Sequence, residues 1–134
     1  MNKIQITQEV INQIQKTIGT YPIETGGIIG GSDTCITHFC FDDHNSENSY
    51  VPNVSFLNEA IKKWANENVE FLGIIHSHPS FSTGPSLEDL KYAVNLKRKN
   101  PFLNRLFFPI VIDNKIVFYE LLNDKFVKID FEVI

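Results

Sequence analysis

A short stretch in the second half of the chain contains residues that commonly bind metals. It is His-Ser-His-Pro at 76–79, and it is followed by Ser86 and Asp89. Side chains two apart on a strand point to the same face, so His76 and His78 can offer two imidazoles to one ion. Two histidines and a carboxylate are a zinc ligand set that leaves the fourth position open, as in catalytic rather than structural sites. Zinc held in this way would polarise a carbonyl and lower the pKa of a water toward about 7.

The elements around this motif are suited to bring its parts together. Residues 71–75 form a continuous apolar run, typical of a strand buried on both faces, and the histidines follow where this strand ends. Pro79 lacks the N–H that a ladder hydrogen bond needs, so we expect the chain to leave the sheet there. Ser86 can begin a third helix whose first turn contains Asp89. If that helix begins beside the end of the strand, its carboxylate supplies the third ligand.

Each part of the motif also has a simpler interpretation. A His-x-His pair can be two ordinary strand histidines. Ser86 followed by Asp89 is also the pattern of a helix N-cap with an acidic residue in the first turn. The ordered combination, at the end of an apolar strand and the start of a helix, favours the metal site.

The remaining sequence predicts a single α/β domain over residues 1–134, with a mixed, mostly antiparallel sheet and three helices. Thr7 is a suitable N-cap for the first helix and Ser55 for the second. Apolar residues recur at helical spacing in both: Val10, Ile11, Ile14 and Ile18 in the first, and Leu57, Ala60, Ile61, Trp64 and Ala65 in the second.

The predicted strands are separated by turn and loop residues. A glycine-rich strand covers 24–31, its antiparallel partner covers 35–41, and a short edge strand at 50–51 lies in the polar loop 42–54. Strands over 106–112 and 115–122 are joined by a tight turn at 113–114, and Pro109 indicates an edge position or a bulge. Strict alternation of apolar and polar residues predicts one last strand over 127–133.

The composition excludes several classes of protein. The chain has 134 residues and a net charge of −4, which argues against a nucleic-acid partner. It has no apolar run of about 18 residues that would span a membrane, and its first residues lack the apolar core of a secretory signal. Cys35 and Cys40 should lie on opposite faces of one strand and not pair with each other. We therefore expect a cytoplasmic protein without thiolate zinc ligands.

The spacing of the site residues resembles a known motif. The motif is His-Ser-His-Pro, with seven residues between the second histidine and a serine, then two residues and an aspartate. This pattern resembles the JAMM motif of the MPN-domain metalloproteases, most of all in their short prokaryotic branch. That family also has an upstream glutamate at the start of a glycine-rich strand, which Glu24 matches. The resemblance implies an MPN, cytidine-deaminase-like architecture, with zinc bound by His76, His78 and Asp89.

The same resemblance implies roles and a substrate. Glu24 would accept a proton from the attacking water and deliver it to the leaving amine. Ser86 would donate a hydrogen bond to the oxyanion. The implied activity is a zinc-dependent peptidase or isopeptidase that acts on the C-terminal tail of a ubiquitin-like or sulfur-carrier protein. The glycines after Glu24 would keep the floor of the cleft open for this tail, and Phe81 and the loop 42–54 are candidates to shape the groove.

Two other classes of function remain compatible with the sequence. A non-catalytic MPN scaffold would only bind partners, although scaffolds of this kind lack some of the ligands that are all present here. A zinc hydrolase of another amide, such as a small amino-acid conjugate or a cell-wall peptide, would need the same motif, since the motif does not specify the acyl group. Cytidine deamination is disfavoured because the Pro-Cys-x-x-Cys half of that zinc signature is missing.

Overall fold

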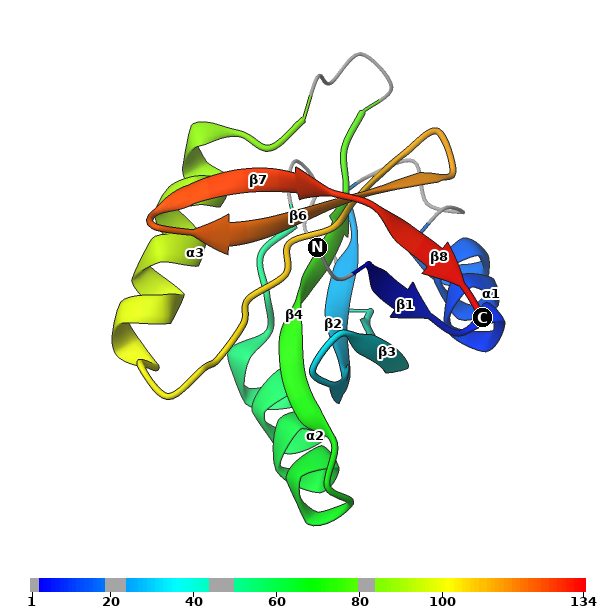
Figure 1. Ribbon diagram of the computed structural model, residues 1–134, viewed down its shortest axis with the longest axis horizontal. Helices are drawn as coiled ribbons and strands as arrows, with labels where there is room; N and C mark the ends of the chain where they lie inside the picture. The colour runs from blue at the N-terminus through cyan, green and yellow to red at the C-terminus, as the bar shows by residue number, and fades with distance from the viewer. Residues whose placement is uncertain (1–2, 19–23, 44–49, 80–83) are drawn as a thin grey trace.

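The computed structural model describes residues 3–18, 24–43, 50–79 and 84–134, which form an eight-stranded mixed sheet and three helices (Figure 1). The strands are Ile4–Ile6 (β1), Gly26–Ser32 (β2), Cys35–Asp42 (β3), Glu70–Ser77 (β4), Ile110–Ile112 (β5), Lys115–Leu122 (β6), Lys125–Ile129 (β7) and Phe131–Val133 (β8). The helices are Gln8–Thr17 (α1), Val54–Asn66 (α2) and Leu87–Lys99 (α3). The predicted α/β class with a mixed sheet and three helices is confirmed.

The strand that leads to the histidines lies in the middle of the sheet. The strand order is β7-β6-β5-β4-β2-β3-β1-β8, and β4 pairs antiparallel with β2 and parallel with β5. Neighbouring residues of β2 and β4 alternate between two hydrophobic cores. Ile29 and Ile75 belong to one core, and Ile28 and Ile74 belong to the other. Strand β4 is therefore buried on both faces, as its continuous apolar run predicts.

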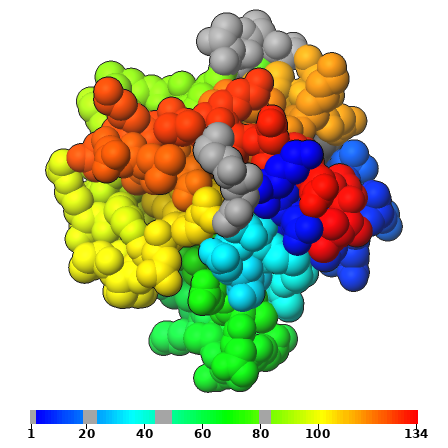
Figure 2. Space-filling model, viewed as in Figure 1, coloured from blue at the N-terminus to red at the C-terminus, as the bar shows by residue number. Residues whose placement is uncertain are grey.

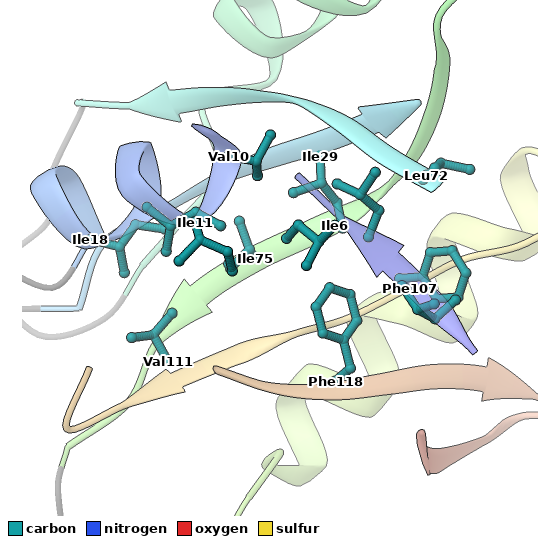
Figure 3. Packing of buried hydrophobic residues seen from close by; sticks show 13 residues of the cluster. Ile6, Val10, Ile11, Ile18, Ile29, Leu72, Ile75, Phe107, Val111 and Phe118 are labelled. Atoms are coloured by element: carbon teal, nitrogen blue, oxygen red, sulfur yellow. The ribbon is translucent and has the colours of Figure 1, made fainter. Parts of the chain in front are cut away.

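Helix α1 covers one face of the sheet, and α2 and α3 cover the other. Thr7 caps α1, and the buried Val10 and Ile11 pack in the core that contains Ile75 (Figure 3). Leu57 and Trp64 of α2 and Ala93 of α3 belong to the second core. Among the described residues, no helix is long and apolar enough to cross a membrane.

The two ends of the sheet are joined by the last segment of the chain. β7 pairs with β6 and β8 pairs with β1, with only Asp130 between them. Figure 1 shows β7 running directly into β8, and Figure 2 shows the C-terminal residues beside the N-terminal strand. The prediction of one uniform strand over 127–133 is wrong in this respect. Alternation identifies the two faces of a strand but not its partner, and the partner changes at Asp130.

Two predictions about α2 are wrong. The helix begins after Asn53, whose side chain accepts a hydrogen bond from Phe56 N at 3.0 Å, and Ser55 lies inside the helix. Asparagine and serine are equally good N-caps, so residue type alone could not choose between them. Ala65, expected on the buried stripe, is exposed, although Trp64 beside it is buried in the second core.

Two predictions about strands also differ from the structure, and a further strand was not predicted. Residues 50–53 form no strand. The strand expected over 106–112 is regular only as β5, and before Pro109 the pairing is limited to isolated bridges of Phe107 with Gly73 and Glu120. Because β5 lies between two strands, the edge position for Pro109 is wrong, and the interrupted ladder agrees better with the alternative interpretation, a bulge. β1 was not expected, since three residues are too few to show a periodicity.

The glycines of β2 make room for the protein itself. A Cβ on Gly26 would lie 2.6 Å from the Tyr50 ring and from Ile75 O, and one on Gly27 would lie 2.2 Å from Cys40 O. Both separations are too short for a real side chain, so glycine is needed for close packing at these positions. The prediction that these glycines leave the cleft floor open for a substrate is therefore wrong.

Candidate metal centre

The two histidines present their imidazoles to one point at the end of β4. Their Nε2 atoms are 2.8 Å apart. His76 is only 4% exposed, and its ring packs edge-on against Phe108 and stacks on Tyr50, with centroids 5.1 and 6.3 Å away. Within the described part of the chain, His76 Nδ1 is buried and has no hydrogen-bond partner. Ring packing therefore holds the orientation of this imidazole, where a hydrogen bond to Nδ1 would be usual.

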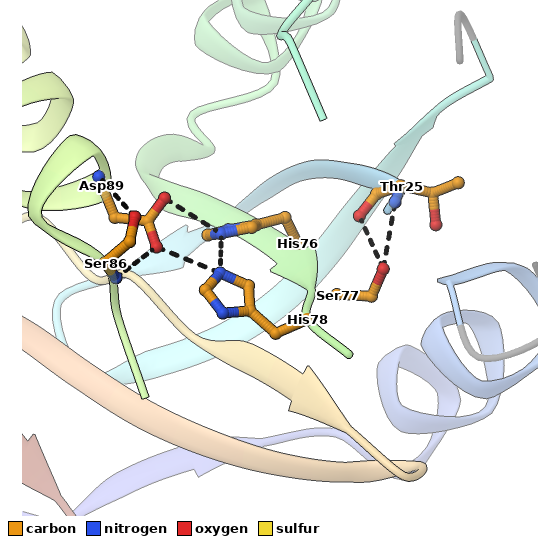
Figure 4. A network of polar contacts seen from close by, with 6 residues as sticks. All are labelled: Thr25, His76, Ser77, His78, Ser86 and Asp89. Carbon is orange, nitrogen blue, oxygen red and sulfur yellow. Dashed lines mark hydrogen bonds and ion pairs between the residues drawn. The ribbon is translucent and has the colours of Figure 1, made fainter. Parts of the chain in front are cut away.

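Helix α3 brings the carboxylate of Asp89 to both histidines. Its Oδ1 lies 3.3 Å from His76 Nε2 and its Oδ2 lies 3.0 Å from His78 Nε2 (Figure 4). Ser86 caps the helix: its Oγ accepts a hydrogen bond from Asp89 N at 3.1 Å, and its own N–H donates to Asp89 Oδ2 at 2.9 Å. The capping interpretation of Ser86 and Asp89 is confirmed, and the same capping box directs the carboxylate to the imidazoles.

The donor atoms fit a zinc ion. Burial acts to raise the pKa of Asp89, but hydrogen bonds from His76 and His78 and from the Ser86 N–H hold that pKa well below its ordinary value. The carboxyl is therefore ionised, as a metal ligand must be. Zinc–nitrogen bonds of about 2.0–2.1 Å place tetrahedral ligand atoms about 3.3 Å apart. The separation of 3.3 Å equals this value, and those of 3.0 and 2.8 Å are shorter.

Glu24 approaches the histidines from the neighbouring strand. One ligand atom from each of Glu24, His76 and His78 lies within 4.8 Å of the others, a group that could hold a metal ion. The pairing of β2 with β4 explains this position. Gly26 is the register partner of His76, so the residues just before β2 emerge beside the end of β4.

All five predicted site residues line one cleft of about 750 Å³. They are Glu24, His76, His78, Ser86 and Asp89. Apolar parts of the lining come from Tyr50, Pro52, Ile74, Tyr92 and Phe108. The cleft therefore combines a candidate metal centre, the neighbouring Glu24 carboxylate and a serine hydroxyl with apolar walls that can contact a substrate.

Sequence reasoning missed the residue pair that supports one of these walls. Asp42 is fully buried at the end of β3, and its Oδ2 accepts hydrogen bonds from Tyr50 OH at 3.0 Å and Asn53 N at 2.8 Å. Burial, followed by the Asp42 carboxylate, raises the pKa of Tyr50 far above its ordinary value, so the phenol stays protonated and keeps donating. No sequence signal marks this pair, because the contact depends on the path of the loop that connects the two residues.

The loop candidates are only partly described. Phe81 and residues 44–49 of the loop 42–54 lie outside the described residues. Tyr50 and Pro52, from the described part of the loop, line the cleft, as expected for a segment that shapes a groove.

One family model matches most of the sequence. Residues 5–120 match the model of the prokaryotic homologs of the JAB domain. The chain belongs to this family. No curated protein matches the sequence of this JAB domain.

Solved structures share the fold of this prokaryotic JAB domain. A solution structure of a Desulfitobacterium hafniense protein matches with a TM-score of 0.74 at 19% identity, over 98% of this chain and 92% of that one. A JAB1/MPN-domain protein from Archaeoglobus fulgidus matches with a TM-score of 0.63 at 20% identity, over 98% and 99%. A structure presented as a JAMM metalloprotease-like zinc site in the proteasome and signalosome matches with a TM-score of 0.60 at 19% identity, over 99% of both chains. These matches establish the JAB/MPN fold.

Proposed function

We propose that this JAB domain is a zinc-dependent peptidase or isopeptidase. It would cleave a peptide or isopeptide bond at the C-terminal tail of a ubiquitin-like or sulfur-carrier protein in the cytoplasm. The observation that carries the proposal is the convergence of two imidazole nitrogens and an ionised carboxylate at one point, with Glu24 beside them in the same cleft. Glu24 is a second carboxylate beside the three proposed ligands. A purely structural zinc site has no need of such a group, so its presence favours a catalytic site.

Each residue of the cluster has a distinct task in this proposal. His76, His78 and Asp89 would hold the zinc ion, which when bound polarises the scissile carbonyl and makes a water nucleophilic near neutral pH. Glu24 takes the proton from the attacking water and passes it to the leaving amine. The hydroxyl of Ser86 accepts the Asp89 N–H with a lone pair, so its own proton remains available to donate to the developing oxyanion.

The form of the cleft supports a protein tail as the substrate. The cleft volume of about 750 Å³ exceeds what a single amino acid needs, and its apolar walls suit an extended peptide. One fold neighbour is presented as a JAMM metalloprotease-like zinc site in the proteasome and signalosome. This likeness supports a protein substrate over a small amide.

Zinc analysis and cleavage assays test the proposal. The purified protein should contain about one zinc per chain. It should hydrolyse the peptide bond between the tail of a ubiquitin-like protein and a fused partner, and the isopeptide bond between that tail and a lysine side chain. A chelator should abolish both cleavages, and zinc should restore them. Glu24→Gln should lower kcat by about 10²–10⁴-fold while zinc stays bound. Glu88→Gln is the matched control. Glu88 also lines the cleft, but it is neither a proposed zinc ligand nor part of the group that Glu24 forms with the two histidines.

The outcomes separate the competing functions. Equal activity in wild type and Glu24→Gln would refute the role of Glu24. Bound zinc without any cleavage would indicate a scaffold that binds partners. Cleavage of a small amino-acid conjugate but not of the protein tail would indicate a hydrolase of another amide.

A further inference from the structure

We propose that Ser77, the residue between the two histidines, is a positioning residue for Glu24. Its hydroxyl holds the backbone of Thr25 at the point where β2 begins, and this contact keeps the Glu24 carboxylate beside His76 and His78. The inference rests on the proposed function, in which Glu24 moves the proton.

The contacts between Ser77 and Thr25 tie the two strands together just outside their regular ladder. Ser77 N donates to Thr25 O at 2.8 Å. Thr25 N donates to Ser77 Oγ at 3.0 Å, and the same hydroxyl donates to Thr25 O at 3.5 Å (Figure 4). The last ladder pair of β2 and β4 is Gly26 with His76. At the next position the serine hydroxyl takes the place of the backbone carbonyl that would continue the ladder.

The Ser77 backbone is paired on both sides. Its N–H donates to Thr25 O at 2.8 Å, and on the other side the strand pairs with Val111 of β5, where His78 N donates to Val111 O at 2.9 Å. The Thr25 N–H donates to the Ser77 hydroxyl. An aliphatic side chain could not accept this hydrogen bond.

The location of Ser77 excludes a direct part in the chemistry. Side chains alternate along a strand, so Ser77 points away from the face that carries the two imidazoles. Figure 4 shows its hydroxyl directed at Thr25, on the side opposite Asp89. The hydroxyl does not line the cleft, so its effect on catalysis must pass through the neighbouring backbone.

The hydrogen bond is important because Thr25 is fully buried. Without Ser77 Oγ, the Thr25 N–H would be a buried donor without an acceptor, and such a group is costly enough for the backbone to move toward another partner. Glu24 is the adjacent residue, so its carboxylate would move with this backbone. A displacement of about 1 Å at a reacting group can lower a rate by about 10²-fold.

Kinetics on three variants of Ser77 test the inference. Ser77→Ala removes the acceptor, Ser77→Cys replaces it by a weak one of similar size, and Ser77→Thr keeps the hydroxyl. Ser77→Ala and Ser77→Cys should lower kcat about 10- to 100-fold, with KM and zinc affinity by chelator competition unchanged. Ser77→Thr should recover most of kcat. Ser32→Ala, at the other end of β2, is the matched control and should behave as wild type.

A double-mutant comparison shows whether Ser77 acts through Glu24. In the Glu24→Gln background, Ser77→Ala should cause no further loss of kcat, because the residue that Ser77 positions is already disabled. A further loss of the full 10- to 100-fold would overturn the proposal. A lower melting temperature of Ser77→Ala with wild-type kcat would also overturn it, since that result indicates a purely structural role.

Crystal structures of the variants give a readout that does not depend on peptidase activity. In Ser77→Ala, and equally in Ser77→Cys, the Glu24 carboxylate should leave the 4.8 Å group that it forms with the two histidines. In Ser77→Thr it should remain there. A Glu24 carboxylate that stays in place in both Ser77→Ala and Ser77→Cys refutes the positioning role, even if the substrate class is also wrong. A displaced carboxylate in an enzyme without cleavage would uphold the positioning role and reject only the proposed function.

Discussion

Ser86 has two tasks that a set of substitutions can separate. Its Oγ accepts the N–H of Asp89 at 3.1 Å and so caps α3, and its proton is free to donate to an oxyanion in the cleft. Replacing an N-cap serine by alanine costs about 1 kcal/mol. For a chain of this length, that loss lowers the melting temperature by roughly 3–5 °C. Loss of an oxyanion donor lowers kcat by about 10²–10³-fold.

Glycine and threonine at this position distinguish the two effects. Glycine is an acceptable N-cap and costs only a few tenths of a kcal/mol relative to serine, but it has no hydroxyl. Threonine keeps both the cap and the hydroxyl. We therefore expect Ser86→Gly to be nearly as stable as wild type but about as slow as Ser86→Ala, and Ser86→Thr to keep both stability and rate.

The assay combines thermal denaturation with tail cleavage at saturating zinc. Zinc affinity is measured in parallel, because the Ser86 N–H also donates to the Oδ2 of Asp89 at 2.9 Å and a frayed first turn would weaken the metal site. Wild-type kcat in zinc-loaded Ser86→Gly would refute the oxyanion role. An unchanged melting temperature in Ser86→Ala would refute the loss of stability of about 1 kcal/mol that is expected when the N-cap is removed.

Three further predictions concern the support of the site. Arg105→Met leaves the buried Glu120 without its two hydrogen bonds of 2.7 and 2.9 Å. The free energy of unfolding, measured with urea, should fall by about 3–5 kcal/mol, and the double variant with Glu120→Leu should recover most of this loss. Gly73→Ala puts a Cβ 2.0 Å from Phe107 O and should lower the urea midpoint by the equivalent of about 1–3 kcal/mol; an unchanged midpoint would contradict this packing. The pKa of Tyr50 is raised in the folded state, so the contribution of this residue to stability is complete below pH about 10 and is lost as the pH rises further. The free energy of unfolding should therefore decrease less above pH about 10 in Tyr50→Phe than in wild type.

Local patterns were sufficient for the parts of the site that lie within one element. His76 and His78 share a face because side chains alternate along a strand, and Asp89 follows Ser86 in the first turn because that spacing is a capping box. The apolar run before the histidines likewise predicted the doubly buried β4. These features depend on covalent geometry and on interactions between near neighbours, which the order of residues determines directly.

Contacts between distant segments required the tertiary structure. The approach of Glu24 to the histidines depends on the β2–β4 register and on Ser77, which holds the backbone next to it. Tyr50 stacks on His76 and donates its hydroxyl hydrogen to the buried Asp42, and both contacts join residues that are far apart in the local pattern.

The last segment of the chain shows the difference most clearly. Its alternating residues predicted a strand from the sequence alone, although Val127 and Val133, on the predicted apolar face, are exposed. The change of partner at Asp130, which joins the two ends of the sheet, follows from how the whole sheet curves. The sequence by itself determined the residues that can bind a metal and the elements that carry them. The pairing of strands far apart in the chain decided which of these residues meet, because packing and long-range hydrogen bonds leave no periodic signal.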